Sequence, residues 1–375
     1  MELMFKYYNP SNIIFETGLL DNSKRLSDLI GKGDEYCIFT YGDDIFKEYC
    51  NKITKAIGEP KLIIDNILPN PDYANLKSIS KDFSKECKSI KKVIALGGGS
   101  VIDTAKFIVL GKGDFDKTVQ YLEKKNDFID PTDIDLISIP TTAGTGSELT
   151  CWATIWDEKN QRKHSLIHPT LFSKLSLFDS NLTLSLPKKI TIETSLDAMS
   201  HAFESIWNIN SNPVSNIHAI SAIKIIMDSL PNLLEDLENI KLREEIMKAS
   251  MYAGLAFSNT KTAISHSISY PITLKYKVPH GIACSFTLPI ILKSVQGLDE
   301  VCDKNFKLLF SDFNGAPEKL IEFFSKINVS TNFKDYIGNA NDWQMIVKDA
   351  FAGERGKNFI GNYQKVLQAQ DSLGY

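Results

Sequence analysis

The feature that most constrains the fold of this 375-residue chain is the regular alternation, in its first half, of short apolar runs with helical stretches. Apolar, β-branched runs predict strands at 35–40, 61–64, 92–96 and 135–139, and helical patterns at 44–56 and 73–87 separate the first three. Helices of this length can connect parallel strands across the face of a sheet. We therefore expect an α/β domain whose parallel sheet is covered by helices on both faces.

The second half of the chain has a different pattern. Apolar residues recur at helical spacing through 198–207, 217–230, 240–257 and 320–327, with few strand-like runs. A chain of this length also exceeds the size at which one hydrophobic core stops growing. We expect two domains, an α/β domain over 1–182 and an all-α domain over 183–375.

Composition excludes several classes of protein. The formal net charge is −4, from 42 basic and 46 acidic residues, and so provides no overall field that favours nucleic acid or an anionic membrane. Aromatic residues make up 10% of the chain, which is inconsistent with disorder. The six cysteines contain no C-x-x-C pair, the N-terminus lacks the apolar core of a signal peptide, and no run approaches the roughly 18 apolar residues of a membrane span. We expect a cytoplasmic protein with reduced thiols.

The first motif that carries chemistry is Gly97-Gly98-Gly99-Ser100, directly after the predicted strand 92–96. Glycines let the backbone approach a diphosphate, and the amides at the start of the next helix favour anions. Ser100 and Asp103 have the spacing of an N-cap and its capping-box partner. The plainer alternative is a capped strand-to-helix turn that binds nothing.

The second motif, PTTAGTGSE over 140–148, follows the predicted strand 135–139. It concentrates hydroxyl groups and glycines, which can hydrogen-bond phosphate and ribose oxygens without adding charge, although an ordinary polar loop is the alternative. Two such loops after neighbouring strands point to one crevice at the carboxyl edge of the sheet.

The third motif is a set of metal-binding residue types in the second domain. Asp197 and His201 are four residues apart in a helical pattern, so they share one face, and His266 and His280 follow. Neutral imidazoles with one carboxylate suit Fe(II) or Zn(II) rather than calcium or magnesium. Taken singly, each histidine is more often structural, and we interpret His164, His168 and His218 as structural.

GGGSVIDTAK (97–106), PTTAGTGSE, DAMSHAFE (197–204) and the pair His266 and Pro279-His280-Gly281 resemble, in order and spacing, the iron-containing (group III) alcohol dehydrogenases. The resemblance runs from Pro10 to the 353–359 region. It implies an enzyme with a Rossmann-like dinucleotide-binding domain, an all-α metal-binding domain and a homodimeric state. It also implies a divalent ion, Fe(II) or Zn(II), and NADH or NADPH.

The resemblance assigns roles to residues that match the family pattern. The metal ligands it implies are Asp197, His201, His266 and His280. The cofactor-binding residues it implies are Gly97, Gly98, Ser100, Asp103, Thr141, Thr142, Thr145, Ser147 and Lys163.

Three departures from the family pattern limit this transfer. Tyr270 stands where many members have a second histidine near the nicotinamide. Thr40-Tyr41-Gly42 lacks the acidic residue that NAD-preferring members often place after the second strand, so the choice between NAD and NADP stays open. Ser195-Leu196 replaces a common glycine before the pair Asp197-Ala198.

HSISYP (266–271) and ATIWD (153–157) look like the branch that reduces phosphonoacetaldehyde to 2-hydroxyethylphosphonate. The expected reaction is hydride transfer between NAD(P)H and a small aldehyde or alcohol, with Tyr270 or water as the proton donor and Trp152 as a candidate wall of the substrate pocket. A generalist short-chain alcohol dehydrogenase is the main alternative. A dehydroquinate synthase-like lyase and a non-catalytic scaffold are more distant alternatives.

Overall fold

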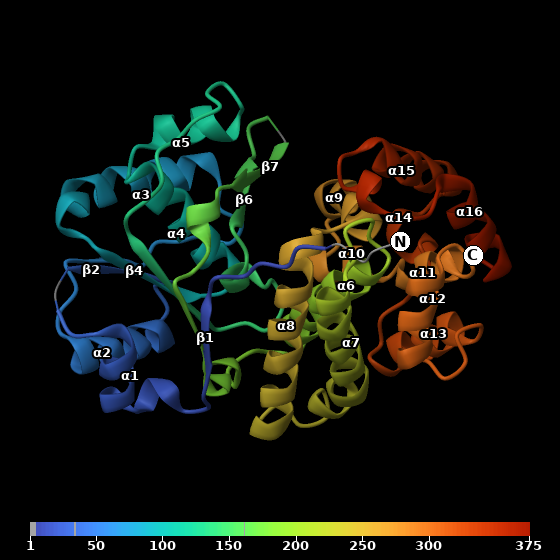
Figure 1. Ribbon diagram of the computed structural model, residues 1–375, viewed down its shortest axis with the longest axis horizontal. Helices are drawn as coiled ribbons and strands as arrows, with labels where there is room; N and C mark the ends of the chain where they lie inside the picture. Colours follow the sequence, from blue (N-terminus) through green and yellow to red (C-terminus); the bar gives the residue numbers. More distant parts are fainter. Residues whose placement is uncertain (1–4, 34, 161) are drawn as a thin grey trace. The chain divides into compact units, whose positions relative to one another are not determined.

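The computed structural model describes residues 5–33, 35–160 and 162–375. The chain forms two compact units. Asn9–Thr142 and Ser147–Thr183 make up the first, which we call the α/β unit. The second, the helical unit, comprises Ala143–Gly146, Leu184–Tyr375 and residues 5–8. Figure 1 colours the α/β unit blue to green and most of the helical unit yellow to red.

The α/β unit is built on a six-stranded parallel sheet in the order β1-β8-β5-β4-β2-β3. The strands are β1 (Asn12–Phe15), β2 (Tyr36–Phe39), β3 (Leu62–Ile64), β4 (Lys92–Gly97), β5 (Asp135–Pro140) and β8 (Leu175–Phe178). The helices of this unit are α1 (Ser23–Ile30), α2 (Asp44–Ile57), α3 (Tyr73–Glu86), α4 (Gly99–Gly111) and α5 (Phe115–Leu122).

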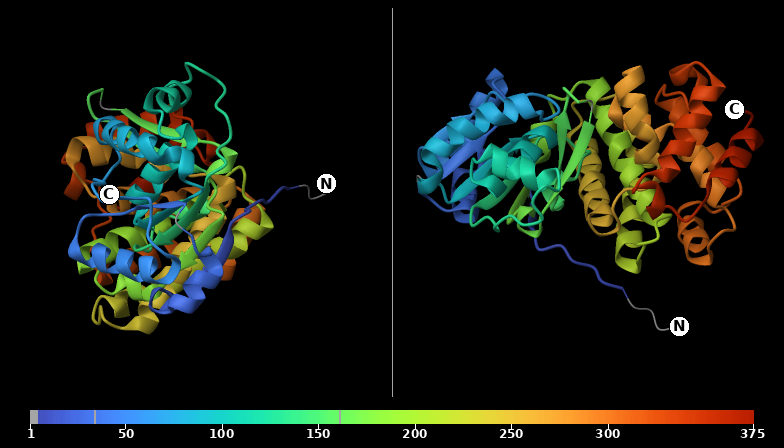
Figure 2. Two further views of the ribbon diagram at one scale, coloured as in Figure 1. Left: turned by 90° about the vertical axis from the view of Figure 1, so that its left-hand side faces the viewer. Right: turned by 90° about the horizontal axis from the view of Figure 1, so that it is seen from above.

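Helices cover both faces of this sheet, because the strands carry apolar side chains on both faces. In β4, Ile94 and Leu96 pack in the core under α1 and α2, whereas Val93 and Ala95 pack in the core under α3, α4 and α5. Successive side chains of a strand point to opposite faces, so a strand buried on both sides is apolar throughout. Figure 1 and the left view of Figure 2 show the sheet between the two helical layers.

A two-stranded antiparallel hairpin, β6 (Trp152–Asp157) and β7 (Arg162–Ile167), follows the second polar loop. Short 3₁₀ turns complete the α/β unit at Leu19–Asp21, Cys87–Ser89, Ser147–Leu149, Pro169–Leu171 and Ser180–Thr183.

The helical unit contains α6 (Lys188–Ile206), α7 (Pro213–Leu233), α8 (Ile240–Thr260), α9 (Ile264–Tyr276), α10 (His280–Ser285), α11 (Leu288–Val295), α12 (Glu300–Leu309), α13 (Ala316–Lys326), α14 (Lys334–Ile337), α15 (Ala340–Ala352) and α16 (Tyr363–Ser372), with a 3₁₀ turn at Gly356–Asn358. Helices α6, α7 and α8 pack on one another, and α10 packs on α6 and α9. Among the residues that the structure describes, no helix is both long and apolar enough to cross a bilayer.

The predicted α/β architecture, parallel sheet and helical second half are confirmed. The four predicted strands correspond to β2, β3, β4 and β5. The edge strand β1, its neighbour β8 and the hairpin were not predicted. The pairing of Asn12 with Leu175 joins chain segments too far apart for local patterns to reveal.

Candidate metal centre and nucleotide-binding loops

In the α/β unit, the two polar loops start side by side at the carboxyl edge of the sheet. The strand register pairs Gly97, the last residue of β4, with Pro140, the last residue of β5. A Cβ atom at Gly97 would lie 2.4 Å from Val101 Cγ2, and one at Gly98 would lie 3.2 Å from Thr142 Oγ1. Glycine at 97 is therefore required for packing, whereas a side chain at 98 would crowd Thr142.

The predicted capping pair at the start of α4 is wrong. The helix begins at Gly99 with Gly98 as its N-cap, two residues earlier than expected, so Ser100 lies inside the first turn. Ser100 Oγ instead accepts a hydrogen bond from the Asn70 amide at 3.1 Å. The Asp103 carboxylate accepts from Ser147 Oγ at 2.6 Å and from the Thr154 amide at 2.8 Å.

A buried lysine organises the chain that follows the second loop. Lys106 Nζ donates to the carbonyl oxygens of Ser147 at 2.6 Å, Thr150 at 2.8 Å and Trp152 at 2.8 Å. Burial lowers the pKa of Lys106 to about 8 and raises the pKa of the neighbouring Glu148 carboxyl to about 7. We call Asp103, Lys106, Ser147 and Glu148 the lysine network. The sequence analysis missed the part played by Lys106.

The remaining predicted cofactor residues divide between several places. The Thr141 amide donates to the Gly97 carbonyl at 3.1 Å, and Thr142 lies against Gly98. Both threonines therefore contact the turn at Gly97 and Gly98, which we call the glycine turn. Thr145 belongs to the helical unit. Lys163 lies on the β6–β7 hairpin with its Nζ 5.3 Å from the centroid of the Trp156 ring.

In the helical unit, three histidines surround one carboxylate oxygen. Asp197 Oδ1 lies 3.4 Å from His266 Nε2, 3.8 Å from His201 Nε2 and 3.9 Å from His280 Nε2. Asp197 and His201 come from α6, His266 from α9 and His280 from the first residue of α10. The four residues predicted as metal ligands are thus adjacent, and we call them the imidazole cluster.

Glu204 fixes the orientation of His266. Its carboxylate is fully buried, accepts from the amides of Ala263 and His266 at the start of α9, and lies 2.7 Å from His266 Nδ1. A proton on Nδ1 is used in this bond, so Nε2 is the ring nitrogen that faces Asp197. Such a carboxylate behind a histidine is typical of metal sites. Glu204 stands seven residues after Asp197 in DAMSHAFE, but spacing alone gave it no role.

The electrostatics of the imidazole cluster favour an added positive charge. Burial alone would raise the pKa of Asp197, but the three imidazoles outweigh it and lower that pKa. Burial lowers the pKa of His201 to about 4, which keeps the ring neutral. Burial also opposes protonation of His266, yet Glu204 and Asp197 outweigh it and raise its pKa.

The cluster passes a test of fit for a divalent ion. His266 Nε2 is buried and has no hydrogen-bond partner among the described residues, although it faces a carboxylate. An unsatisfied buried nitrogen is costly unless something coordinates it. Three imidazoles and one carboxylate form a donor set that Fe(II) and Zn(II) prefer.

Cys284 is a further neighbour that the sequence analysis missed. Its Sγ lies 3.6 Å from Asp197 Oδ1 and within 4.8 Å of the nearest donor atoms of His266 and His280. Burial raises the pKa of this thiol well above its usual value, so it is protonated and donates to Asp197. We interpret it as a support for the carboxylate.

The close approach of α10 to α6 explains the glycine in Pro279-His280-Gly281. A Cβ atom at Gly281 would lie 1.8 Å from the Glu193 carbonyl oxygen of α6. Any side chain here would push α10 outward, and His280 with it. Gly281 is therefore part of what brings His280 to Asp197.

Tyr270, the predicted proton donor, lies beside this cluster. Its ring stacks on the His280 ring with centroids 6.2 Å apart and planes 8° apart. Burial raises the pKa of the Tyr270 hydroxyl to about 12. The phenol therefore carries its proton at neutral pH.

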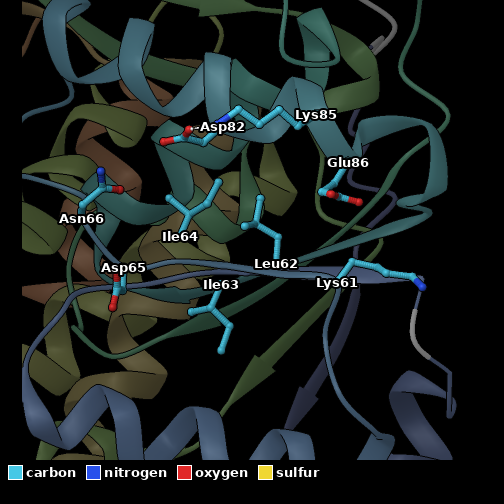
Figure 3. A pocket seen from close by; sticks show the side chains of 9 residues that line it. All are labelled: Lys61, Leu62, Ile63, Ile64, Asp65, Asn66, Asp82, Lys85 and Glu86. Atoms are coloured by element: carbon cyan, nitrogen blue, oxygen red, sulfur yellow. Dashed lines mark hydrogen bonds and ion pairs between the residues drawn. The ribbon is translucent and has the colours of Figure 1, made fainter.

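Two other features of the α/β unit are less suited to chemistry. A hollow of about 340 Å³ between β3 and α3 is lined by apolar and charged side chains, and two of these, Asp82 and Lys85, pair at 2.8 Å (Figure 3). Glu123, Asp157 and His164 lie within 4.8 Å of one another. The two carboxylates are already paired, Glu123 with Lys125 and Asp157 with Asn160.

Comparison with known proteins agrees with this geometry. Residues 10–180 match the family model for iron-containing alcohol dehydrogenase, and residues 191–370 match the model for the C-terminal part of the Fe-containing alcohol dehydrogenase family.

Among curated proteins, a probable alcohol dehydrogenase, EutG, of Escherichia coli is 36% identical over 54% of this chain and 50% of its own length. A phosphonoacetaldehyde reductase of Streptomyces viridochromogenes is 33% identical over 53% of this chain and 52% of its own. The chain thus spans about half the length of these curated relatives. A solved structure, sulfoacetaldehyde reductase from Bifidobacterium kashiwanohense in complex with NAD+, matches with a TM-score of 0.87 and 25% identity over 99% of both chains. The chain belongs to the iron-containing alcohol dehydrogenase family of oxidoreductases.

Proposed function

We propose that the chain catalyses reversible hydride transfer between NAD(P)H and a small aldehyde, and that it reduces phosphonoacetaldehyde to 2-hydroxyethylphosphonate. The observation that carries the reaction class is the imidazole cluster, with three Nε2 atoms within 3.9 Å of one carboxylate oxygen. The substrate rests on the strings HSISYP and ATIWD and on the phosphonoacetaldehyde reductase among the relatives.

In this proposal Asp197, His201, His266 and His280 hold Fe(II) or Zn(II). When bound, the ion supplies Lewis acidity for the carbonyl group, and the nicotinamide supplies the hydride. Glu204 keeps the His266 proton on Nδ1, so that Nε2 is a ligand atom. Cys284 donates to Asp197 and holds its orientation.

The glycine turn at 97–98, Ser100 and the threonines at 141, 142 and 145 are proposed to bind the dinucleotide, with Lys163 toward the ribose. Asp103 and Ser147 already bond to each other, so we assign them to the support of this loop. We further propose a homodimer, as expected for the family.

Tyr270 is proposed to hold the proton that the product alcohol acquires. A phenol with a pKa of about 12 is protonated at neutral pH and can donate when an alkoxide forms beside it. Replacing Tyr270 by Phe should lower kcat about tenfold or more across the pH range. Unchanged turnover would leave water as the donor.

The test of the reaction class is an anaerobic rate comparison. Protein loaded with Fe(II) or Zn(II) is assayed by NADH and NADPH absorbance with phosphonoacetaldehyde and with propanal. Net consumption with phosphonoacetaldehyde as the better substrate supports the proposal. A preference for propanal indicates a generalist alcohol dehydrogenase, and no consumption with either aldehyde under any loading overturns the oxidoreductase assignment.

A further inference from the structure

The His201 ring of the imidazole cluster lies between two other aromatic rings. On one side the Phe257 ring stacks on it, with centroids 4.0 Å apart and planes 6° apart. On the other side the His266 ring stacks on it at 4.5 Å and 19°. Phe257 is buried and lies on α8, a helix that carries no residue of the cluster. Because the ring is held on both faces, the direction of His201 Nε2 toward Asp197 depends on Phe257.

Phe257 also contacts the second polar loop. A Cβ atom at Gly146 would lie 2.7 Å from Phe257 Cε1 and 2.9 Å from the Gly254 Cα atom, so the backbone of the loop lies directly on α8. Gly146 has a φ of +61°, in the left-handed region that favours glycine. A side chain at position 146 would therefore push against the Phe257 ring.

The same loop packs on α6, which carries two residues of the imidazole cluster. A Cβ atom at Gly144 would lie 2.5 Å from the Thr194 carbonyl oxygen of α6. Thr145 lies between two buried glycines and is itself only partly buried. Residues 143–146 belong to the helical unit, so all these contacts lie within the unit that holds the cluster. The loop thus rests on α6 and, through Phe257, on α8.

We propose that Phe257 is a positioning residue that joins the dinucleotide-binding loop to the metal centre. It holds the His201 ring in the plane that a divalent ion requires, and it supports Gly146 next to Thr145, which is proposed to bind the dinucleotide. Order gained on one side of Phe257 is then shared by the other side. The ion and the dinucleotide therefore strengthen each other's binding by the same factor. The inference rests on the proposed function and adds a coupling between its two cofactors.

The first test measures metal affinity and does not depend on turnover. Zn(II) affinity of the full chain is measured by competition with a chelator, and visible absorption of the Co(II)-loaded protein reports the ligand field. Phe257→Leu should weaken Zn(II) binding about 10-fold and change the Co(II) spectrum, because it removes the ring behind a ligand. Phe324→Leu, at a fully buried ring on α13, is the matched control and should leave both unchanged. Circular dichroism confirms the fold of each variant.

A second variant displaces Phe257 from the side of the loop. Gly146→Ala places a methyl group against the Phe257 ring and should weaken Zn(II) binding about threefold or more. Gly338→Ala is the matched control, because Gly338 has a φ of +80° and no described atom lies within 4 Å of a Cβ there. It introduces similar backbone strain without the contact and should keep the parent affinity. If Phe257→Leu and Gly146→Ala both keep the parent affinity, the positioning role is overturned.

Dinucleotide binding tests the coupling. Fluorescence titration gives the Kd of NADH, or of NADPH where that binds more tightly, with and without saturating Zn(II). In the parent we expect Zn(II) to lower this Kd about fivefold or more. In Phe257→Leu and Gly146→Ala the factor should fall to about 2 or less, whereas both controls should keep the parent value. A parent without coupling, or variants that keep the full factor, would overturn the link through Phe257, and the second result would indicate direct contact between the ion and the dinucleotide.

The failure of this inference is distinguishable from the failure of the proposed function. A parent that reduces aldehydes, with variants that keep its metal affinity and its coupling, overturns the inference alone. A parent that binds both cofactors with coupling through Phe257 but reduces no aldehyde overturns the function alone. A parent that binds neither Zn(II) nor Fe(II) overturns both, because both require an ion at the imidazole cluster.

Discussion

The lysine network and the imidazole cluster are both buried and polar, but they differ in how completely their groups are satisfied. Lys106 donates to three carbonyls, and Asp103 accepts from Ser147 and Thr154. In the cluster, His266 Nε2 faces Asp197 without a hydrogen bond among the described residues. Buried polar groups that all have hydrogen-bond partners stabilise a fold, whereas a buried group without one is available to bind a ligand. Mutations should therefore affect stability in the first region and chemistry in the second.

The largest effect is expected from Asp197→Asn, which removes the carboxylate from among the three imidazoles. Metal content should fall to a small fraction of one per chain, and turnover should fall roughly 1,000-fold or more. The measurements are elemental analysis of purified protein and NADH oxidation. Cys284→Ser is the control and should retain metal, and loss of metal in that variant would make the thiol a ligand.

In the lysine network, Lys106→Met should lower the free energy of unfolding by about 3–5 kcal/mol, because it leaves Asp103 buried without its cation. Urea unfolding measures this. The exposed control Lys85→Met should cost at most about 1 kcal/mol. The metal content of the folded variant should be unchanged. A loss of metal with little loss of stability would show that Lys106 serves metal binding and not stability.

The unfolding free energy should depend on pH because of Glu148 in the lysine network. Burial raises the pKa of this carboxyl from 4.5 to about 7, so the folded chain binds the proton more tightly than the unfolded chain does. The stabilisation is complete below pH 4.5 and is lost as pH rises through 7, by up to about 3 kcal/mol.

The measurement for Glu148 is the unfolding free energy of the parent minus that of Glu148→Gln at each pH. This difference should fall between pH 4.5 and 7, because glutamine does not titrate. A flat difference would mean that Glu148 is ionised in the folded chain across that range.

The smallest effect is expected from Glu204→Gln, which keeps the shape but weakens the bond to His266 Nδ1. Metal affinity should fall about 10- to 100-fold. Competition with a chelator measures it, and Glu245→Gln, at an ion pair on α8, is the matched control. Unchanged affinity would show that the orientation of His266 does not depend on the carboxylate.

The distance along the chain between interacting residues explains what could be predicted from the sequence. The strands that became β2 to β5 are continuous apolar runs between turn residues, so local pattern identified them. Asp197 and His201 are one helical turn apart, so spacing alone placed them on one face. Local pattern could not reveal which distant segments meet. The pairing of β1 with β8, the bond from Glu204 to His266 and the stacking of Phe257 on His201 all join residues separated along the chain.

The capping pair at Ser100 and Asp103 shows a second reason for failure. Both residues have the correct types and spacing for a cap, but the helix starts two residues earlier, and Asp103 accepts instead from Ser147 and Thr154. A local rule fails where the backbone starts the helix at another residue and distant partners take up the polar side chains.

The glycine at position 281 has a consequence for anyone who would redesign the metal preference of this protein. With 1.8 Å between a Cβ atom there and the Glu193 carbonyl oxygen, even alanine must separate two helices that each carry a residue of the imidazole cluster. Libraries aimed at a larger ion should therefore vary the residues around the proposed ligands and keep this position constant, because a side chain here would move His280 away from Asp197.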